Sequence, residues 1–270
     1  MPELPEVETT RRSLLPHVVG ARITAVTVRE RRFRQPLAVD FEARLAGRAV
    51  ATLERQGKYL LFGLDDGTTL LVHLGMSGSL ELTKSGTPLA VHDHVVVGFD
   101  RGLQMVFNDP RRFGLMRLGQ GQDFAELRNV GRDSLSAAPS VDEWRALTRG
   151  RRLSIKNLLM DQRVLGGVGN IYASEMLFRA GIRPRRRAAT LTRAELARLA
   201  DALRAVLERA VELGGSSISD YRDANGNPGY FQIHHAVYDR DGRPCVTCAT
   251  PIKRVVQSGR SSFYCPRCQR

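Results

Sequence analysis

The first residues of the chain, from Met1 to Glu8, combine a proline with carboxylates in an order that could support covalent catalysis. Removal of the initiator methionine, which the small proline ring permits, would expose the secondary amine of Pro2. An α-amino group has a pKa near ~8, so part of it is neutral at cellular pH and can attack an electrophilic carbon to form an iminium. Glu3 adds a carboxylate beside that amine. The alternative is that proline and early acids simply open a helix, since both suit its first turn.

All four cysteines lie near the end of the chain, as two Cys-x-x-Cys pairs. Cys245 pairs with Cys248, and Cys265 pairs with Cys268. Each pair presents two thiolates from one knuckle, and two knuckles complete a tetrahedral metal site. Four protein ligands leave no open position, so the spacing predicts one structural zinc ion. A redox pair is disfavoured because no βαβ pattern surrounds these cysteines.

The segment between the two cysteine pairs, residues 257–264, predicts a β-hairpin with Arg260 at its tip. A hairpin held by zinc could push this arginine into a DNA groove. The alternative is an exposed arginine in an ordinary turn.

A glycine-rich turn, residues 166–170, lies between two predicted helices and ends in Asn170. Glycines let the backbone approach a phosphate, and the following helix start offers free N–H groups and a positive dipole. Glycine turns between helices are common. Together with Arg151, Arg152 and Lys156 this turn becomes a candidate phosphate clamp.

Several residues of the N-terminal half have both a functional and a structural interpretation. Residues 108–114 place two arginines beside Phe113, a pattern that could read a base edge and wedge into a vacated stack, or form a polar turn over a core ring. Met76 is either a core residue or a flexible gap filler. His92 is either a phosphate donor or a surface histidine. Lys58 is either a solvated strand-edge residue, or a proton donor or competing Schiff-base amine.

The elements that must position these residues change along the chain. Residues 3–15 predict a helix that stops at Pro16. Short alternating and apolar segments then predict strands, with turn signals between them, at residues 22–28, 58–62, 69–74, 94–99, 103–107 and 113–118. Strands of this length and spacing predict a β-sandwich. Residues 119–150 have the composition of a connecting region.

The pattern becomes helical from Leu153. One helix precedes the glycine turn, a second runs over about 170–179, and a capping box at Thr192 and Glu195 opens a third. The apolar stripe of that third helix predicts a bundle core. Residues 216–230 have loop composition and are long enough to suggest a functional lid.

The composition points to a polyanionic partner. The chain of 270 residues carries 41 Lys and Arg against 28 Asp and Glu, a formal net charge of +13. An excess of this size is most typical of nucleic-acid binding. No apolar run approaches the ~20 residues of a spanning helix, and no signal peptide is recognisable, so we expect no membrane association and an intracellular protein.

Together these motifs resemble formamidopyrimidine-DNA glycosylases, the bacterial base-excision repair enzymes for oxidised purines. The resemblance covers essentially the whole chain. Its motifs occur in the family's order and spacing: Pro2-Glu-Leu-Pro-Glu-Val-Glu8, Gly57-Lys-Tyr-Leu60, His73-Leu-Gly-Met-Ser-Gly78, Asp109-Pro-Arg-Arg-Phe-Gly114, Gly167-Val-Gly-Asn-Ile-Tyr-Ala-Ser-Glu175 and the four-cysteine finger with Arg260.

The resemblance implies an α+β fold. Its parts would be an N-terminal β-sandwich flanked by helices, a helix–two-turn–helix region and a C-terminal β-hairpin zinc finger. We accordingly expect a catalytic domain at 1–130, a connecting segment at 131–150, a DNA-binding domain at 151–230 with a lesion loop at 216–230, and the finger at 231–270.

The resemblance also implies a role for each candidate residue. Pro2 would attack C1′ of the damaged nucleotide, Glu3 would transfer protons, Lys58 would serve β-elimination and Arg260 δ-elimination. The positions that match DNA contacts are His92, Arg111, Arg151, Lys156 and Asn170. Those that match the set filling the gap left by the extruded nucleotide are Met76, Arg111 and Phe113, with Arg111 reading the orphaned cytosine. Zinc, duplex DNA with oxidised bases or abasic sites, a monomer and a cytoplasmic location complete the expectation.

Two alternatives remain. The sister family of endonuclease VIII-like glycosylases removes oxidised pyrimidines with the same machinery, but those chains usually begin Pro-Glu-Gly-Pro-Glu, whereas position 4 here is Leu4. A non-catalytic, zinc-stabilised DNA-binding protein would need only the basic charge and the finger.

Overall fold

The computed structural model describes residues 1–217 and 222–270. The chain divides into two compact units. The first consists of residues 1–128 and 213–230, and the second of residues 129–212 and 231–270. The finer division into four parts made from the sequence stays a prediction. No helix among the described residues is long and apolar enough to cross a membrane.

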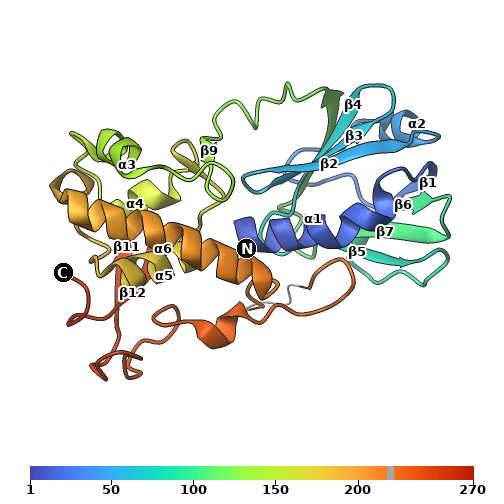
Figure 1. Ribbon diagram of the computed structural model, residues 1–270. Helices are drawn as coiled ribbons and strands as arrows, with labels where there is room; N and C mark the ends of the chain where they lie inside the picture. The colour runs from blue at the N-terminus through green and yellow to red at the C-terminus, as the bar shows by residue number, and fades with distance from the viewer. Residues whose placement is uncertain (218–221) are drawn as a thin grey trace. The chain divides into compact units, whose positions relative to one another are not determined.

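The first unit is a β-sandwich of two four-stranded antiparallel sheets (Figure 1). One sheet has the order β1-β6-β7-β5 and the other β2-β3-β4-β8. The strands are β1 (Ile23–Val28), β2 (Val50–Gln56), β3 (Tyr59–Leu64), β4 (Thr68–His73), β5 (Ser79–Lys84), β6 (Asp93–Phe99), β7 (Leu103–Asn108) and β8 (Leu115–Gln120). Inward residues of both sheets, such as Val97 and Phe107 from one and Phe62 and Val72 from the other, share one hydrophobic core. The α+β class and the predicted sandwich are confirmed.

Helix α1 (Leu4–Val18) packs against β2 and β3 and buries Val7, Leu14 and Val18 in the same core. The prediction that this helix stops at Pro16 is wrong, because the helix continues for two more residues. Proline lacks an N–H and so removes one helical hydrogen bond, but in the last turn that loss is small compared with the burial of Val18.

Some elements of this unit were missed in the sequence. Strand β2 carries Glu54, Arg55 and Gln56, which hide its alternation, and the short helix α2 (Phe41–Leu45) buries only Phe41 and Leu45. The predicted turns are present. Gly67, at φ +82°, and Gly102, at φ +69°, stand in the left-handed region that glycine tolerates best.

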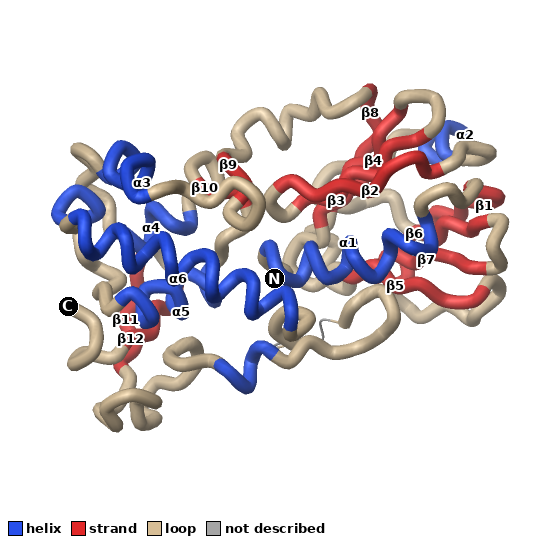
Figure 2. The backbone as a smooth tube through the Cα atoms, viewed as in Figure 1, coloured by secondary structure: helices blue, strands red, loops and turns tan. Residues whose placement is uncertain are grey.

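The second unit is mainly helical (Figure 2). Its helices are α3 (Val141–Thr148), α4 (Ile155–Met160), α5 (Asn170–Ala180) and α6 (Arg193–Glu212), with short 3₁₀ turns η1 (Ala188–Thr190) and η2 (Phe231–His234). Two short strands, β9 (Arg132–Asp133) and β10 (Leu165–Gly166), pair in parallel. Helix α5 packs on α6, whose predicted apolar stripe is buried throughout.

Local sequence explains where these helices begin and end. The predicted capping box is present: the Thr192 N–H donates to Glu195 Oε2 at 2.8 Å. Helix α5 ends at Ala180 and is capped by Gly181, at φ +72°. Residues 119–150, predicted to be a connecting region, contain helix α3. Its own capping box, Ser140 with Glu143, was a signal in the sequence, and Trp144 is fully buried.

The predicted C-terminal hairpin is present as β11 (Lys253–Gln257) and β12 (Arg260–Tyr264). The joining residues Ser258 and Gly259 both have positive φ, at 48° and 73°, the conformation that suits a tight hairpin. Arg260 is the first residue after this turn and is exposed.

Candidate active site and nucleic-acid interface

The N-terminus of α1 holds the candidate catalytic residues in a buried position. Pro2 is buried and Glu3, the residue that caps α1, is 2% exposed. The backbone N–H of Glu3 donates to Glu6 Oε2 at 2.7 Å. This pairing of Glu3 with Glu6 fixes the backbone directly after Pro2.

Glu6 also belongs to this site, although the sequence alone assigns it no role. It is 2% exposed, and its Oε1 accepts the N–H of Ser216 at 2.7 Å. A Cβ on Gly215 would lie 2.7 Å from Glu6 Oε1, so only glycine allows this approach. One carboxylate therefore joins the N-terminal residues to the start of the 216–230 loop. Residues 218–221 of that predicted lesion loop lie outside the described residues.

Four charged side chains act on the amine at the chain terminus, which belongs to Met1. Burial lowers the pKa of this amine below its usual value of 8.0, Glu3 and Glu6 oppose the shift, and Lys58 and Arg111 add to it. A lowered pKa enlarges the neutral, nucleophilic fraction of an amine at a given pH. Lys58, directly before β3, is 7% exposed, so it is a buried residue and not a solvated edge residue.

Helix α1 is anchored by a second carboxylate. Glu8 accepts hydrogen bonds from Arg11, Arg12 and Arg55, and its pair with Arg55 is nearly buried, with side chains 6% and 5% exposed. Burial acts against the charged form, but the three arginines together lower the pKa of Glu8 to about 2.

This arrangement predicts acid sensitivity of the fold. Because the pKa of Glu8 is depressed in the folded state, its contribution is present above pH ~4.5 and is lost as the pH falls through ~2, which amounts to about 3 kcal/mol. Denaturant unfolding at several pH values should show a smaller loss of stability between pH 5 and 2 for Glu8→Gln than for the wild type. Glu212→Gln, at an exposed position, is the control. Equal acid slopes for all three proteins would contradict the assignment.

His73 lies at the end of β4, next to the loop that carries Met76. Burial, with smaller contributions from the positive charges of Lys58 and Arg34, lowers the pKa of His73 to about 4. The ring is therefore neutral near pH 7, and its Nδ1 accepts the N–H of Gly75 at 2.9 Å. This bond fixes the first residue of the loop.

The three candidate gap-filling residues lie on two loops of the first unit. Met76 and Phe113 expose 38% and 48% of their surface, so neither is a core residue. The guanidinium carbon of Arg111 lies 4.8 Å from the centre of the Phe113 ring. His92 is exposed, and its carbonyl accepts the N–H of Asp109 at 3.0 Å.

In the second unit, two of the predicted DNA-contacting residues converge on the finger hairpin. Lys156 is 1% exposed, and its ammonium donates to Ser261 O at 2.9 Å and to Ser262 Oγ at 2.6 Å. The Asn170 side-chain amide donates to the same Ser261 carbonyl at 3.0 Å. Ser261 directly follows Arg260, so this pair fixes the backbone beside that arginine. Arg151, which is half-buried, is not part of this cluster of bonds.

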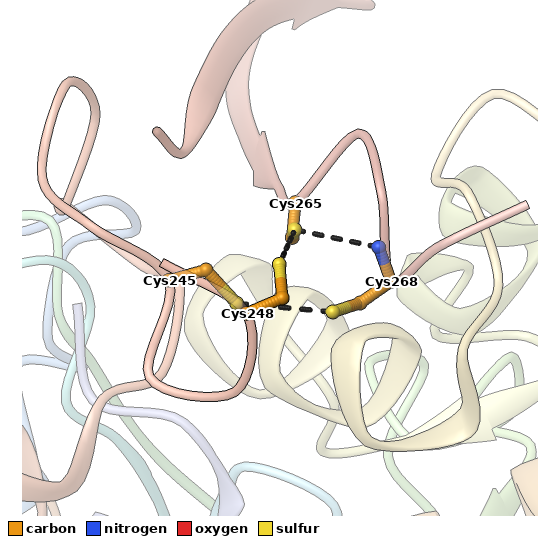
Figure 3. Close-up of side chains that lie close together, drawn as sticks. All are labelled: Cys245, Cys248, Cys265 and Cys268. Carbon is orange, nitrogen blue, oxygen red and sulfur yellow. Dashed lines mark hydrogen bonds between the residues drawn. The ribbon is translucent and has the colours of Figure 1, made fainter. Parts of the chain in front are cut away.

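The four cysteines form a closed metal site (Figure 3). Their sulfur atoms all lie within 4.8 Å of one another; the Cys245–Cys268 separation is 3.9 Å and the Cys248–Cys265 separation 3.5 Å. Tetrahedral zinc with Zn–S bonds of ~2.3 Å places its sulfurs ~3.8 Å apart, so the cluster fits one zinc ion. The predicted structural zinc site is confirmed.

Residues near the start of the predicted finger segment, 231–270, are held by Glu175 of α5, a carboxylate to which the sequence alone assigns no role. Its oxygens accept the backbone N–H groups of Ala236, Val237 and Tyr238 at 2.8, 3.0 and 2.8 Å. Val237 belongs to the small core of the finger. A buried carboxylate thus ties the finger to the helical core of the second unit.

Three family models match successive parts of the chain. That of the formamidopyrimidine-DNA glycosylase N-terminal domain matches residues 1–116, and that of the formamidopyrimidine-DNA glycosylase H2TH domain matches residues 130–222. A zinc finger found in FPG and IleRS matches residues 242–270.

Whole proteins give the same result. Formamidopyrimidine-DNA glycosylases of Thiobacillus denitrificans and Pseudomonas aeruginosa are 51% and 45% identical over the full length of both chains. The crystal structure of the MutM (FPG) protein from Thermus thermophilus is 42% identical, with a TM-score of 0.89 over 99% of this chain and 98% of that one. A Lactococcus lactis FPG mutant in complex with Fapy-dG-containing DNA is 30% identical over all of both chains, also with a TM-score of 0.89.

The sandwich, the helical unit and the zinc finger, together with these relatives, define a base-excision repair DNA glycosylase with AP lyase activity, whose partner is DNA. The chain belongs to the formamidopyrimidine-DNA glycosylase family.

Proposed function

We propose that this enzyme removes oxidised purines, 8-oxoguanine and formamidopyrimidines, through a Schiff base on Pro2 and then cleaves the strand by β- and δ-elimination. The observation that carries the proposal is the buried Pro2, which follows a terminal amine whose pKa is lowered by burial and by the charges of Lys58 and Arg111. A depressed amine pKa is what a nucleophile working near neutral pH requires. The complex of a Lactococcus lactis relative with Fapy-dG-containing DNA supports the substrate class.

The steps follow from the chemistry of an iminium. The Pro2 nitrogen bonds to C1′ as the glycosidic bond breaks, and the base leaves with its electron pair and gains a proton. Glu3 protonates the ring oxygen as the sugar opens, which gives the iminium. The iminium acidifies the C2′ proton, and loss of that proton expels the 3′ phosphate. A further elimination then expels the 5′ phosphate, and water releases Pro2.

Two cations would assist the eliminations. Lys58, buried beside the N-terminus, would provide the proton transfers of β-elimination. Arg260, exposed at the start of β12, would stabilise the departing phosphate of δ-elimination. The hydrogen bonds from Lys156 and Asn170 to Ser261 support a fixed placement of the Arg260 backbone.

One set of residues would bind the DNA phosphates, and a second set would enter the base stack where the damaged nucleotide has left it. His92, Arg151, Lys156 and Asn170 would act on the backbone, while Met76, Arg111 and Phe113 would fill the gap left by the extruded nucleotide. Extrusion is required because C1′ of a stacked nucleotide is inaccessible. Arg111 would read the orphaned cytosine by donating hydrogen bonds to it. The exposure of Met76 and Phe113 supports this set.

The role of Glu3 is tested by Glu3→Gln, which keeps the size of the side chain but removes its acidic proton. Base excision should fall by roughly 10²- to 10⁴-fold, while binding to a duplex with a stable abasic-site analogue stays unchanged. Single-turnover excision and fluorescence anisotropy measure the two quantities. Near-normal turnover would remove Glu3 from the mechanism.

Phosphate contacts predict a steep salt dependence of DNA affinity. The logarithm of the association constant should fall with the logarithm of salt concentration, with a slope of about −0.9 for each phosphate neutralised. Arg151→Gln should make that slope shallower by about one unit, and Arg209→Gln, an exposed position on α6, should not. A flat dependence for the wild type would contradict the phosphate-clamp hypothesis.

The second candidate substrate is an oxidised pyrimidine. It is favoured by one observation, that a wild-type Lactococcus lactis relative, 31% identical to this chain, forms a complex with oxidised-pyrimidine-containing DNA. Leu4 and the intact 109–114 motif favour the purine. We further propose that the enzyme acts as a monomer in the bacterial cytoplasm, where its DNA is; sedimentation of the free and DNA-bound protein would test the first point.

A further inference from the structure

The two loops that carry the gap-filling residues are connected through one buried carboxylate. We call them the wedge loops: residues 75–78 and residues 109–114. Asp109 is fully buried at the end of β7. Its Oδ1 accepts the hydroxyl of Ser77 at 2.8 Å, and its Oδ2 accepts the N–H of Gly114 at 2.7 Å. Ser77 directly follows Met76, and Gly114 directly follows Phe113.

Further bonds close this arrangement. The N–H of Arg111 donates to Ser77 Oγ at 3.3 Å, so the hydroxyl that donates to Asp109 also accepts from the opposite loop. The Asp109 carbonyl is 3.0 Å from Nε2 of the buried His94. Burial of a carboxylate costs free energy unless its oxygens accept hydrogen bonds. Loss of any one of these contacts would therefore weaken the others.

The loops also touch backbone to backbone at Gly75. Its φ is +67°, and a Cβ there would lie 2.4 to 2.6 Å from the backbone of Phe113 and Gly114. No side chain fits between the loops at that distance. Asp109 and Gly75 are thus two independent links between the same two segments.

We propose that Asp109 is a positioning residue that makes the wedge loops one rigid body, so that Met76, Arg111 and Phe113 enter the duplex together. This inference rests on the proposed gap-filling function of those three residues. Side chains that open a base stack must keep their positions against the force of the stacked bases. Exposed side chains on two separately moving loops would be displaced instead. The buried links convert two loops into a single support.

The test compares two reactions that differ in how much stacking must be broken. Excision of 8-oxoguanine from a duplex requires extrusion of a stacked base, whereas a preformed abasic site has no base to unstack. Asp109→Asn keeps the shape but replaces one accepting oxygen by a donor. We expect it to slow single-turnover excision by roughly tenfold to a hundredfold, the effect of losing a hydrogen bond to a charged group, and to spare cleavage of the abasic duplex. The preference for cytosine over adenine opposite the lesion should also decrease.

Milder variants keep the test valid if Asp109→Asn folds poorly. Ser77→Ala should reproduce the selective loss at smaller size, and Ser77→Thr, which restores a hydroxyl, should recover it. Gly75→Ala should resemble Asp109→Asn because its methyl group collides with the other loop. The matched control for Gly75→Ala is Gly102→Ala, because Gly102 has a similar φ of +69° and no atom lies within 4 Å of the added carbon. The control for Asp109→Asn is Asp100→Asn, in the same exposed turn as Gly102.

The outcomes separate cleanly. Selective loss of excision in the Asp109, Ser77→Ala and Gly75 variants, with melting temperatures measured alongside, supports the rigid wedge. An equal loss of activity on both substrates would mean general destabilisation and would overturn the proposal. An Asp109→Asn enzyme with the same activity as Asp100→Asn would overturn it as well. A wild-type enzyme that forms no covalent adduct with either DNA would instead defeat the proposed function.

Discussion

Substitution of Pro2 by glycine should reduce base excision by at least about 10³-fold, equivalent to about 4 kcal/mol of transition-state stabilisation. Glycine leaves a primary amine, whose imine can lose its proton and become neutral, whereas the secondary amine of proline gives an iminium that has no N–H and stays cationic. Glycine also loses the fixed φ with which Pro2 leads into α1. Elimination at a preformed abasic site should be less affected, because the aldehyde is already open to attack.

Blocking the amine is the stricter version of this experiment. A short N-terminal extension that is not removed should abolish both excision and borohydride-dependent trapping while the fold persists. The control is the same extension followed by a protease site, which should regain activity when cleavage regenerates Pro2. Full activity of the blocked enzyme would mean that another amine is the nucleophile, for example Lys58, whose charge acts on the terminal amine.

Loss of zinc should have the second large effect. Among the described residues, the buried core of the finger consists of Val237, Ile252, Phe263 and two cysteines, with Phe178, Tyr238 and the other two cysteines packed against it. A core this small cannot stabilise the hairpin, whereas zinc binding to such modules supplies roughly 10 kcal/mol or more. Chelation, or Cys248→Ser, should therefore unfold the finger and abolish DNA binding.

Hydrogen exchange and metal content measure this directly. Amides of β11 and β12 should lose protection, whereas those of β3 and β4, in the sandwich core of the first unit, should keep it. Val246→Ala, in the same knuckle but 60% exposed, is the matched control. DNA binding at full strength after complete removal of zinc would show that the finger is not needed.

Much of this protein could be predicted from sequence because its signals are local. Turn residues separate the strands, a capping box starts α6, and the cysteine spacing defines the metal site. The predicted helix end at Pro16 was wrong because a proline in the last turn removes a bond at little cost when the next residues are buried. Helix α3 was missed although Ser140 and Glu143 form a capping box.

The rest of the site depends on contacts that are distant in sequence. Glu6 reaches Ser216, Lys156 reaches Ser261, and Asp109 reaches Ser77, and no periodicity reveals such pairs. Sequence also cannot tell whether a polar residue is exposed. Lys58 and Lys156 resemble ordinary surface lysines in the sequence, yet both are buried.

The central claim is that Pro2 is the nucleophile of an oxidised-purine glycosylase. The most direct measurement is borohydride trapping on two duplexes, one with 8-oxoguanine opposite cytosine and one with an oxidised pyrimidine, followed by mapping of the adduct by mass spectrometry. We predict a covalent adduct on Pro2 that forms faster with the purine lesion. An adduct on Lys58, or no adduct on either duplex while binding is intact, would contradict the mechanism, and faster trapping with the pyrimidine would contradict the substrate.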